Sequence, residues 1–141
     1  MKESGIINRN LAAVISEQGH GDLLMVTDAG FAIPRDMEVI DLSLKENVPM
    51  VVDVLAELSR HLSVEKLYMS KETAEMNPSH FKKVSVTFGE DVEVATLAYA
   101  EFKSLSREVK AVIRTGDFTA YGNVILVSGA GDRWYIENSS S

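Results

Sequence analysis

The chain has 141 residues, of which 45% are hydrophobic, 25% are charged and none is cysteine. This length and composition are typical of one globular domain that buries its own core without disulfides or structural metals. The formal net charge is −7, and no cluster of Lys or Arg offsets it, so we expect neither nucleic acid nor an anionic membrane as a partner.

The amino-terminal segment carries an acidic residue and does not place a basic region before a long apolar core, as an export signal would. No apolar run in the sequence approaches the length needed to cross a membrane. The sequence therefore predicts a cytoplasmic protein.

The first predicted helix is capped by Asn8 or Asn10 and ends before Gly19. A buried strand follows at 23–27, because a short apolar run there is bounded by glycine and aspartate turn signals. The remaining predicted elements are a strand at 39–42, a helix from 49 to 62, a strand at 66–69, a helix at 78–84, a strand at 92–97, a helix at 99–108, and strands at 111–114 and 123–128.

This alternation of helices and strands predicts a single α/β domain with a largely parallel sheet covered by helices on both faces. The domain is expected to span residues 1–130. Residues 131–141 are predicted to form a disordered C-terminal extension, since they end in a run of asparagine and serine.

Polar side chains gather at the ends of two predicted strands. His20 lies between two glycines just before the strand at 23–27, and Asp28 directly follows that strand. Tyr121, Gly122 and Asn123 precede the strand that begins at 124. If both strands belong to one sheet, these clusters can converge on a single site.

Each of these residues also has an ordinary structural role. A histidine after a helix can cap its carbonyls, and an aspartate or asparagine in a turn can bond to its own backbone. A tyrosine can cover the core with its hydroxyl at the surface. Together, however, an imidazole, a carboxylate, a phenol and an amide supply the directed hydrogen bonds that a sugar requires.

Motifs for other kinds of chemistry are missing from the sequence. It contains no Walker loop, no Gly-x-Gly-x-x-Gly fingerprint and no Gly-x-Ser-x-Gly elbow. His61 and His80 share no short metal-binding spacing with His20. We therefore expect neither a cofactor nor a metal site.

At these residues the sequence resembles the D-ribose pyranases, also called ribose mutarotases, and more distantly the fucose mutarotases. The resemblance covers nearly the whole chain and is carried by His20-Gly21, Asp28-Ala29-Gly30, Ile33-Pro34, Ala111 to Gly116, and Tyr121 to Leu126. The Asp28-Ala29-Gly30 form favours the ribose branch, whereas the glycine in Tyr121-Gly122-Asn123 is closer to the fucose branch.

The resemblance implies an α/β fold, a homodecamer of two pentameric rings, and sites at subunit boundaries. It implies that His20 transfers the proton, that Asp28 binds the sugar, and that Tyr121, Gly122 and Asn123 make further sugar contacts. One position departs from the ribose branch: Tyr99 stands where those proteins carry a second histidine. A phenol can bond a hydroxyl but does not titrate near neutrality as imidazole does.

The reaction expected from this resemblance interconverts the pyranose and furanose forms of D-ribose, an isomerisation that serves ribose catabolism. Opening and closing a hemiacetal moves only protons, which an imidazole can both give and take at cellular pH. Two alternatives remain at this stage, namely a mutarotase for L-fucose or another aldose, and a sugar-binding protein without turnover.

Overall fold

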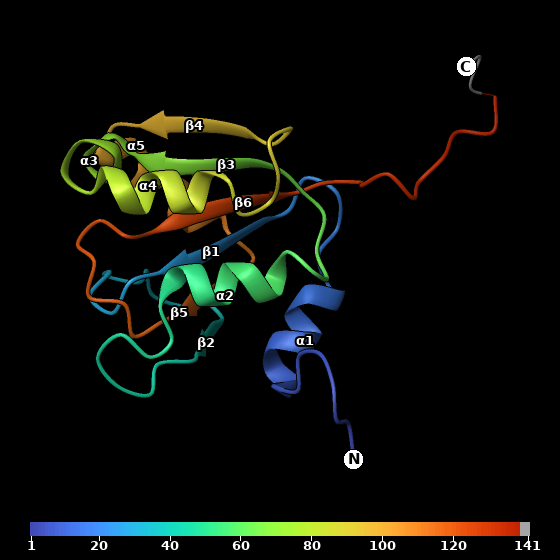
Figure 1. Cartoon of the computed structure of the whole chain (residues 1–141), viewed down its shortest axis with the longest axis horizontal. Helices are drawn as coiled ribbons and strands as arrows, with labels where there is room; N and C mark the ends of the chain where they lie inside the picture. The colour runs from blue at the N-terminus through green and yellow to red at the C-terminus, as the bar shows by residue number, and fades with distance from the viewer. Residues whose placement is uncertain (139–141) are drawn as a thin grey trace.

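The computed structural model describes residues 1–138 and contains a six-stranded sheet in the order β2-β5-β1-β6-β3-β4 (Figure 1). The strands are β1 (Leu23–Thr27), β2 (Val39–Asp41), β3 (Val64–Ser70), β4 (Glu93–Leu97), β5 (Ala111–Arg114) and β6 (Val124–Ser128). The largely parallel sheet predicted from the sequence is confirmed, with β6 as the exception.

Strand β6 runs antiparallel to both of its neighbours, β1 and β3, whereas the other pairings are parallel. Since β1 lies between β5 and β6, the chain returns directly after β5 without the helical crossover that a parallel strand would need. The connecting loop, residues 115–123, therefore passes over the carboxyl end of β1. This path positions the candidate site.

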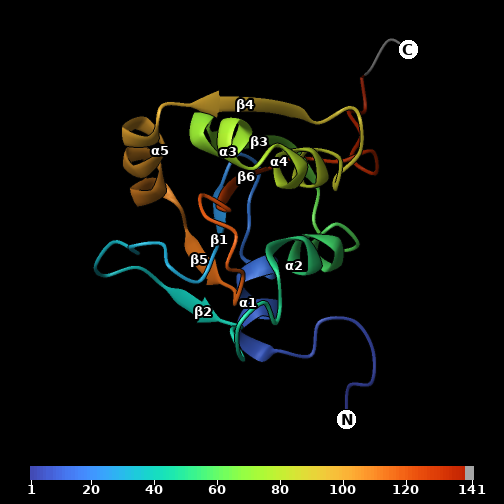
Figure 2. The ribbon, with the colours of Figure 1, turned by 60° about the vertical axis from the view of Figure 1, so that its left-hand side comes forward.

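Helices cover both faces of the sheet, as predicted (Figures 1 and 2). They are α1 (Arg9–Ser16), α2 (Val51–Leu58), α3 (Lys71–Met76), α4 (Pro78–Ser85) and α5 (Tyr99–Leu105). The alternation of side chains along β1 divides the core, because Leu24 and Val26 pack with α1, α2 and α4 while Met25 packs with Phe102 of α5 on the other face.

The ends of the helices follow from local hydrogen bonds. Asn8 caps α1 by accepting the Leu11 N–H at 2.9 Å, so the first of the two predicted caps is the one used. The predicted helix at 99–108 leaves the α-helical form after Leu105 and finishes as a 3₁₀ turn, Ser106–Glu108. Helix α3 was not predicted, because its six residues are too few to show an apolar period.

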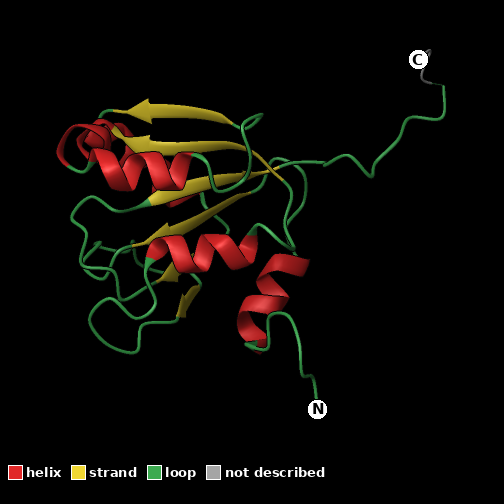
Figure 3. Cartoon of the chain, in the orientation of Figure 1, coloured by secondary structure: helices red, strands yellow, loops and turns green. Residues whose placement is uncertain are grey.

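The predicted extension, residues 131–141, begins shortly after β6, which ends at Ser128. Residues 129–138 contain no helix or strand and lead away from the sheet (Figure 3). Residues 139–141, also part of the predicted extension, lie outside the described residues. Within residues 1–138, no helix is both long and apolar enough to cross a membrane.

Candidate functional site

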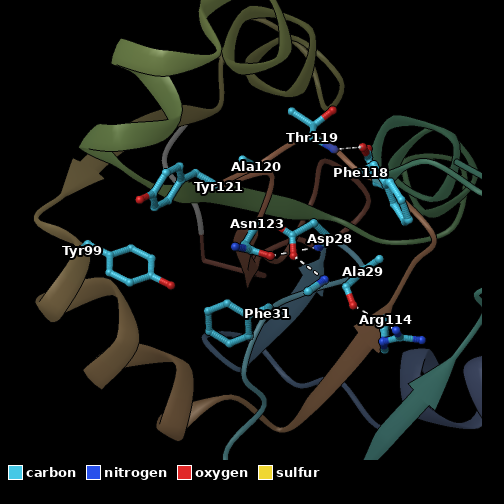
Figure 4. Close-up of a pocket in the computed structure, with 12 residues that line it drawn as sticks. Asp28, Ala29, Phe31, Tyr99, Arg114, Phe118, Thr119, Ala120, Tyr121 and Asn123 are labelled. Atoms are coloured by element: carbon cyan, nitrogen blue, oxygen red, sulfur yellow. Dashed lines mark hydrogen bonds between the residues drawn. The ribbon is translucent and has the colours of Figure 1, made fainter. Parts of the chain in front are cut away.

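An open cavity of about 660 Å³ lies at the edge of the sheet where β1 and β5 end (Figure 4). Its volume is within the range of small-molecule sites, and the carboxyl ends of parallel strands are a common place for them. The residues that line it are Asp28, Ala29, Gly30, Phe31, Tyr99, Arg114, Asp117, Phe118, Thr119, Ala120, Tyr121 and Asn123.

Asp28 lies at the base of the cavity and is held by the surrounding backbone. Its two carboxylate oxygens accept N–H groups from Gly30 at 3.0 Å and from Gly122 at 3.2 Å. Its own N–H donates to the Asn123 side-chain oxygen at 2.8 Å. The carboxylate is therefore fixed in orientation, and its remaining lone pairs can accept hydroxyl groups of a ligand.

Asn123 is only 4% exposed, and the oxygen of its side-chain amide already accepts a hydrogen bond. Because the side-chain oxygen accepts the Asp28 N–H, the amide nitrogen remains as a donor. Figure 4 shows this nitrogen on the side of the cavity that faces Tyr99 and Phe31. Asp28 and Asn123 thus present an acceptor and a donor side by side.

The loop over β1 is fastened to α3 and α4 by its carbonyl groups. The Tyr121 carbonyl accepts the Thr73 hydroxyl at 2.5 Å, and the Gly122 carbonyl accepts His80 Nε2 at 3.0 Å. The Asn77 side-chain amide donates to the Ala120 carbonyl, which precedes Tyr121 in the loop, at 2.6 Å. These contacts hold the loop against the carboxyl edge of β1.

Tyr121 has an unusual backbone conformation, and Gly122 has no room for a side chain. Tyr121 has a φ of +54°, in the left-handed region. At Gly122 an added Cβ would lie 2.8 Å from the Thr119 carbonyl oxygen and 3.5 Å from the Asp28 Cβ. Glycine is therefore required at 122 by close approach, and this is what lets the loop N–H reach Asp28.

The two tyrosines of the cavity pack edge to face, with ring centroids 5.5 Å apart. Figure 4 shows the Tyr99 hydroxyl pointing toward the middle of the cavity and the Tyr121 hydroxyl pointing away from Asp28. Burial raises the pKa of the Tyr99 phenol, and the charges of Asp28 and Glu72 act in the same direction. Tyr99 is therefore a neutral hydrogen-bonding group at physiological pH.

Arg114, at the end of β5, forms the wall opposite the tyrosines. Its guanidinium donates to the Asp41 carboxylate at 3.1 Å, to the Ser43 hydroxyl at 2.6 Å and to the Ala29 carbonyl at 2.9 Å. Burial alone would raise the pKa of Asp41, but Ser43 and Arg114 lower it on balance. The arginine is thus neutralised and serves to hold the segment that follows Asp28.

His20 lies at the other end of β1 from Asp28. The five residues of β1 separate them by roughly 16 Å, at about 3.3 Å per residue. The His20 side chain is 61% exposed, and its Nε2 lies 3.1 Å from Glu65 Oε2. Within one chain, His20 does not reach the cluster at Asp28, because the turn that carries it precedes β1 whereas Asp28 follows β1.

The turn that carries His20 is well braced. Asp22 Oδ2 accepts the Gly19 N–H and the Lys110 ammonium, both at 2.7 Å. Hydrogen bonds from Lys110 and Gly19 lower the pKa of the Asp22 carboxyl. His20 is therefore presented on an ordered turn with its imidazole accessible, as its two glycine neighbours suggested.

The structure brings together Asp28, Tyr99, Tyr121 and Asn123 in the cavity and places Gly122 directly behind Asp28. Sequence reasoning did not single out Phe31, Arg114 or Asp117 as parts of this site. Arg114 had a signal, because it ends a predicted strand. Asp117 had none, since its importance comes from long-range bonds to residues 29 and 51.

Comparison with known proteins agrees with this architecture. The model of the RbsD / FucU transport protein family matches residues 1–131. D-ribose pyranases of Halalkalibacterium halodurans and Bacillus subtilis are 41% and 40% identical, each over 129 residues that make up 92% of this chain and 98% of the relative. The structure described as Bacillus subtilis RbsD complexed with D-ribose has a TM-score of 0.87 and 39% identity, covering 93% of this chain and 99% of that one.

The fold and the cavity define an α/β protein with a polar, aromatic-walled site for a small molecule at the carboxyl edge of its sheet. On the match over residues 1–131 and the identity to its relatives, the chain belongs to the RbsD / FucU family. The structure of FucU from Bifidobacterium longum, with 21% identity and a TM-score of 0.69, shares the fold.

Proposed function

We propose that this protein is a D-ribose pyranase, an isomerase that interconverts the pyranose and furanose forms of D-ribose without a cofactor. The observation that carries the proposal is the Asp28 cavity in a chain about 40% identical, over nearly its whole length, to relatives named D-ribose pyranase. A relative with the same fold and 39% identity has been crystallised with D-ribose.

The geometry of the cavity suits a monosaccharide. Asp28 offers a charged acceptor, Asn123 an amide donor, and Tyr99 a hydroxyl that can do either. Phe31 supplies an apolar wall and is itself held by an edge-to-face contact with Phe102, at 6.4 Å between centroids. A sugar ring has hydroxyl groups on its rim and C–H groups on its faces, which this combination can accommodate.

We propose further that His20 of a neighbouring subunit completes the site. Its imidazole lies too far from Asp28 to act within one chain, yet it is exposed on a braced turn. An assembly that sets the His20 end of one subunit against the cavity of the next would bring the two together at each boundary. A homodecamer of two pentameric rings in the cytoplasm is the arrangement we infer.

In this reaction, imidazolium at His20 gives a proton to the ring oxygen as the bond from that oxygen to C1 breaks, and the anomeric hydroxyl releases its proton to water. The product is the open-chain aldehyde. In closure the 4-hydroxyl attacks C1 and returns its proton to the imidazole, while the carbonyl oxygen takes a proton from water. Atoms and charge balance, and Asp28 with Asn123 holds the sugar throughout.

Tyr99 motivates the alternative functions. A neutral phenol in place of the second histidine of the ribose branch removes one group that could titrate near neutrality. The alternatives are a different aldose as substrate, L-fucose among them, or binding without turnover.

Saturation-transfer NMR on equilibrated D-ribose tests the proposal directly. We expect the wild-type protein to speed exchange between the pyranose and furanose signals, and His20→Ala to return exchange to the uncatalysed rate. His61→Ala is the matched control, since His61 is also a surface histidine paired with a glutamate, at 3.0 Å from Glu57. Sugar binding without faster exchange would leave only the binding function, and faster exchange for L-fucose alone would identify the other substrate.

A further inference from the structure

The last ten residues of this chain extend beyond the family match. The family match ends at residue 131, and 98% of the Halalkalibacterium and Bacillus relatives is already covered by 92% of this chain. Residues 132–138 carry three large side chains with little cover: Trp134 is 78% exposed, Tyr135 88% and Ile136 77%. Adjacent exposed groups of this size are a common mark of a contact surface.

This segment leaves the sheet beside His20. The Gly21 N–H donates to the Ser128 carbonyl at 2.7 Å, so the end of β6 is bonded to the turn that carries the histidine. An added Cβ on Gly129 would lie 3.1 Å from the Cβ of Glu65, the residue that pairs with His20. If the His20 imidazole faces a neighbouring subunit, the extension therefore begins at the same subunit boundary.

The cavity has an unpartnered aromatic side chain on its rim. Phe118 lines the cavity and is 63% exposed, on the side away from Tyr99 (Figure 4). Its backbone is fixed, because its N–H donates to Asn47 Oδ1 at 2.9 Å. From Gly129, the five residues to Trp134 can span roughly 17 Å when extended, so Trp134 can reach well beyond the end of β6.

We propose that the extension of one subunit covers the mouth of the neighbouring subunit's cavity, where Trp134 packs on Phe118 and closes one side of the sugar site. This inference rests on the proposed function, since it uses the subunit boundary that His20 completes. An aromatic ring at this place would contact the C–H face of the sugar and exclude water, and it would raise affinity for the ligand.

Trp134 is the sole tryptophan of the chain, so its fluorescence reports on this segment alone. We expect the emission of the assembled protein to be shifted to the blue relative to a solvent-exposed indole, and to change in a saturable way as D-ribose is added. Phe118→Ala should abolish the blue shift. An emission typical of exposed indole that ribose does not alter would overturn the proposal.

Removal of residues 132–141 and the single change Trp134→Ala should each raise the KM for D-ribose by roughly threefold to tenfold, with little change in kcat. Val86→Ala, which trims an exposed side chain on the far end of α4, is the control and should change neither constant. Unchanged KM in both extension variants would count against the proposal.

Two further outcomes distinguish a failure of this inference from a failure of the proposed function. If D-ribose changes the Trp134 emission but the protein never accelerates exchange between the pyranose and furanose forms, the proposed isomerase function is wrong. The proposal that the extension covers the cavity is then still supported. If Leu42→Ala, in the apolar groove beside α2, abolishes the blue shift and Phe118→Ala does not, the extension docks in that groove and the proposal is wrong.

Discussion

Tyr99 is the residue at which this chain differs most informatively from the ribose branch. Its neighbours, Asp28 and Glu72, are carboxylates, and burial already disfavours a phenolate there. The site therefore contains a hydrogen-bonding group that keeps its proton over the whole physiological range. Tyr99 therefore contributes no pH dependence to the reaction between pH 5 and 8.

The raised pKa of Tyr99 predicts its behaviour on titration. Tyr99→Phe should remove the phenol that ionises last, measured as the loss of the final step in phenolate absorbance at alkaline pH. Because the folded protein holds this proton more tightly than the unfolded chain, stability should decline as pH rises above about 10 and be unaffected below it. Tyr135→Phe, at an exposed phenol, is the control and should leave the alkaline decline in stability unchanged.

Gly122 and Gly30 both donate their N–H to Asp28, but only Gly122 lies too close to other atoms to carry a side chain. Gly122→Ala should push the loop off Asp28, because its Cβ would meet the Thr119 carbonyl at 2.8 Å, whereas a Cβ at Gly30 meets nothing within 4 Å. We expect Gly122→Ala to lower the melting temperature and to weaken ribose binding at least tenfold, a loss of about 1.4 kcal/mol or more. Equal effects in Gly30→Ala would contradict this reading of the loop.

At the scale of elements, Asp117 joins the loop over β1 to helix α2. Its carboxylate accepts the N–H groups of Val51 at 2.9 Å and Thr119 at 2.8 Å, and its carbonyl accepts the Ala29 N–H at 2.8 Å. Met50, the N-cap residue of α2, has no side chain that can accept these bonds. An aspartate 66 residues away therefore caps the helix.

Removing that carboxylate should destabilise the fold. Asp117→Ala leaves the buried N–H of Val51 and the half-buried N–H of Thr119 without partners, and we expect a loss of about 2 to 4 kcal/mol in the free energy of unfolding, measured by urea denaturation. Asp53→Ala, at the exposed side of the same helix end, removes one bond to the Met50 N–H and should cost only about 0.5 to 1 kcal/mol. A smaller loss for Asp117→Ala than for Asp53→Ala would show that the cap is not what α2 depends on.

The elements that sequence reasoning predicted well are those whose pattern is local. Strand β1 is a short apolar run between turn residues, and α2 has apolar side chains at helical spacing after a proline. Helix α3 and the antiparallel direction of β6 were missed, because the first depends on a six-residue segment and the second on which strand lies between β5 and β6. Neither property can be predicted from the residues that are adjacent in the sequence.

The same distinction applies to the candidate site. Asp28, Gly122 and Asn123 stand at strand ends, and the sheet brings them together as the pattern indicated. Arg114 ends a predicted strand but was not singled out, and Asp117 became visible only through contacts across the fold. The order of the sequence already placed His20 before β1 and Asp28 after it. What a single sequence lacks is long-range pairing, and that information decides which segments meet at the end of a strand.

At the scale of the whole molecule, the separation of His20 from Asp28 means that the proposed chemistry requires an assembly of subunits. One subunit would supply the proton-transfer group and the next the sugar-binding cavity, so a monomer would bind sugar weakly and turn it over no faster than water. The exposed imidazole on its braced turn and the open cavity are then two halves of one site, placed at opposite edges of the sheet. A head-to-tail contact of this kind forms a ring when the rotation from one subunit to the next closes, as the proposed pentamers require.

Complementation between inactive variants tests that arrangement. His20→Ala and Asp28→Asn should each be inactive alone, the second retaining an acceptor for the Gly30 N–H so that the loop still folds. When the two variants are co-expressed with different tags and purified as mixed oligomers, a wild-type His20 faces a wild-type cavity at about one quarter of randomly formed boundaries. We expect NMR exchange to recover to about that fraction of the wild-type rate. Mixed oligomers without activity would mean that both groups must come from one chain, and the proposed subunit boundary would be wrong.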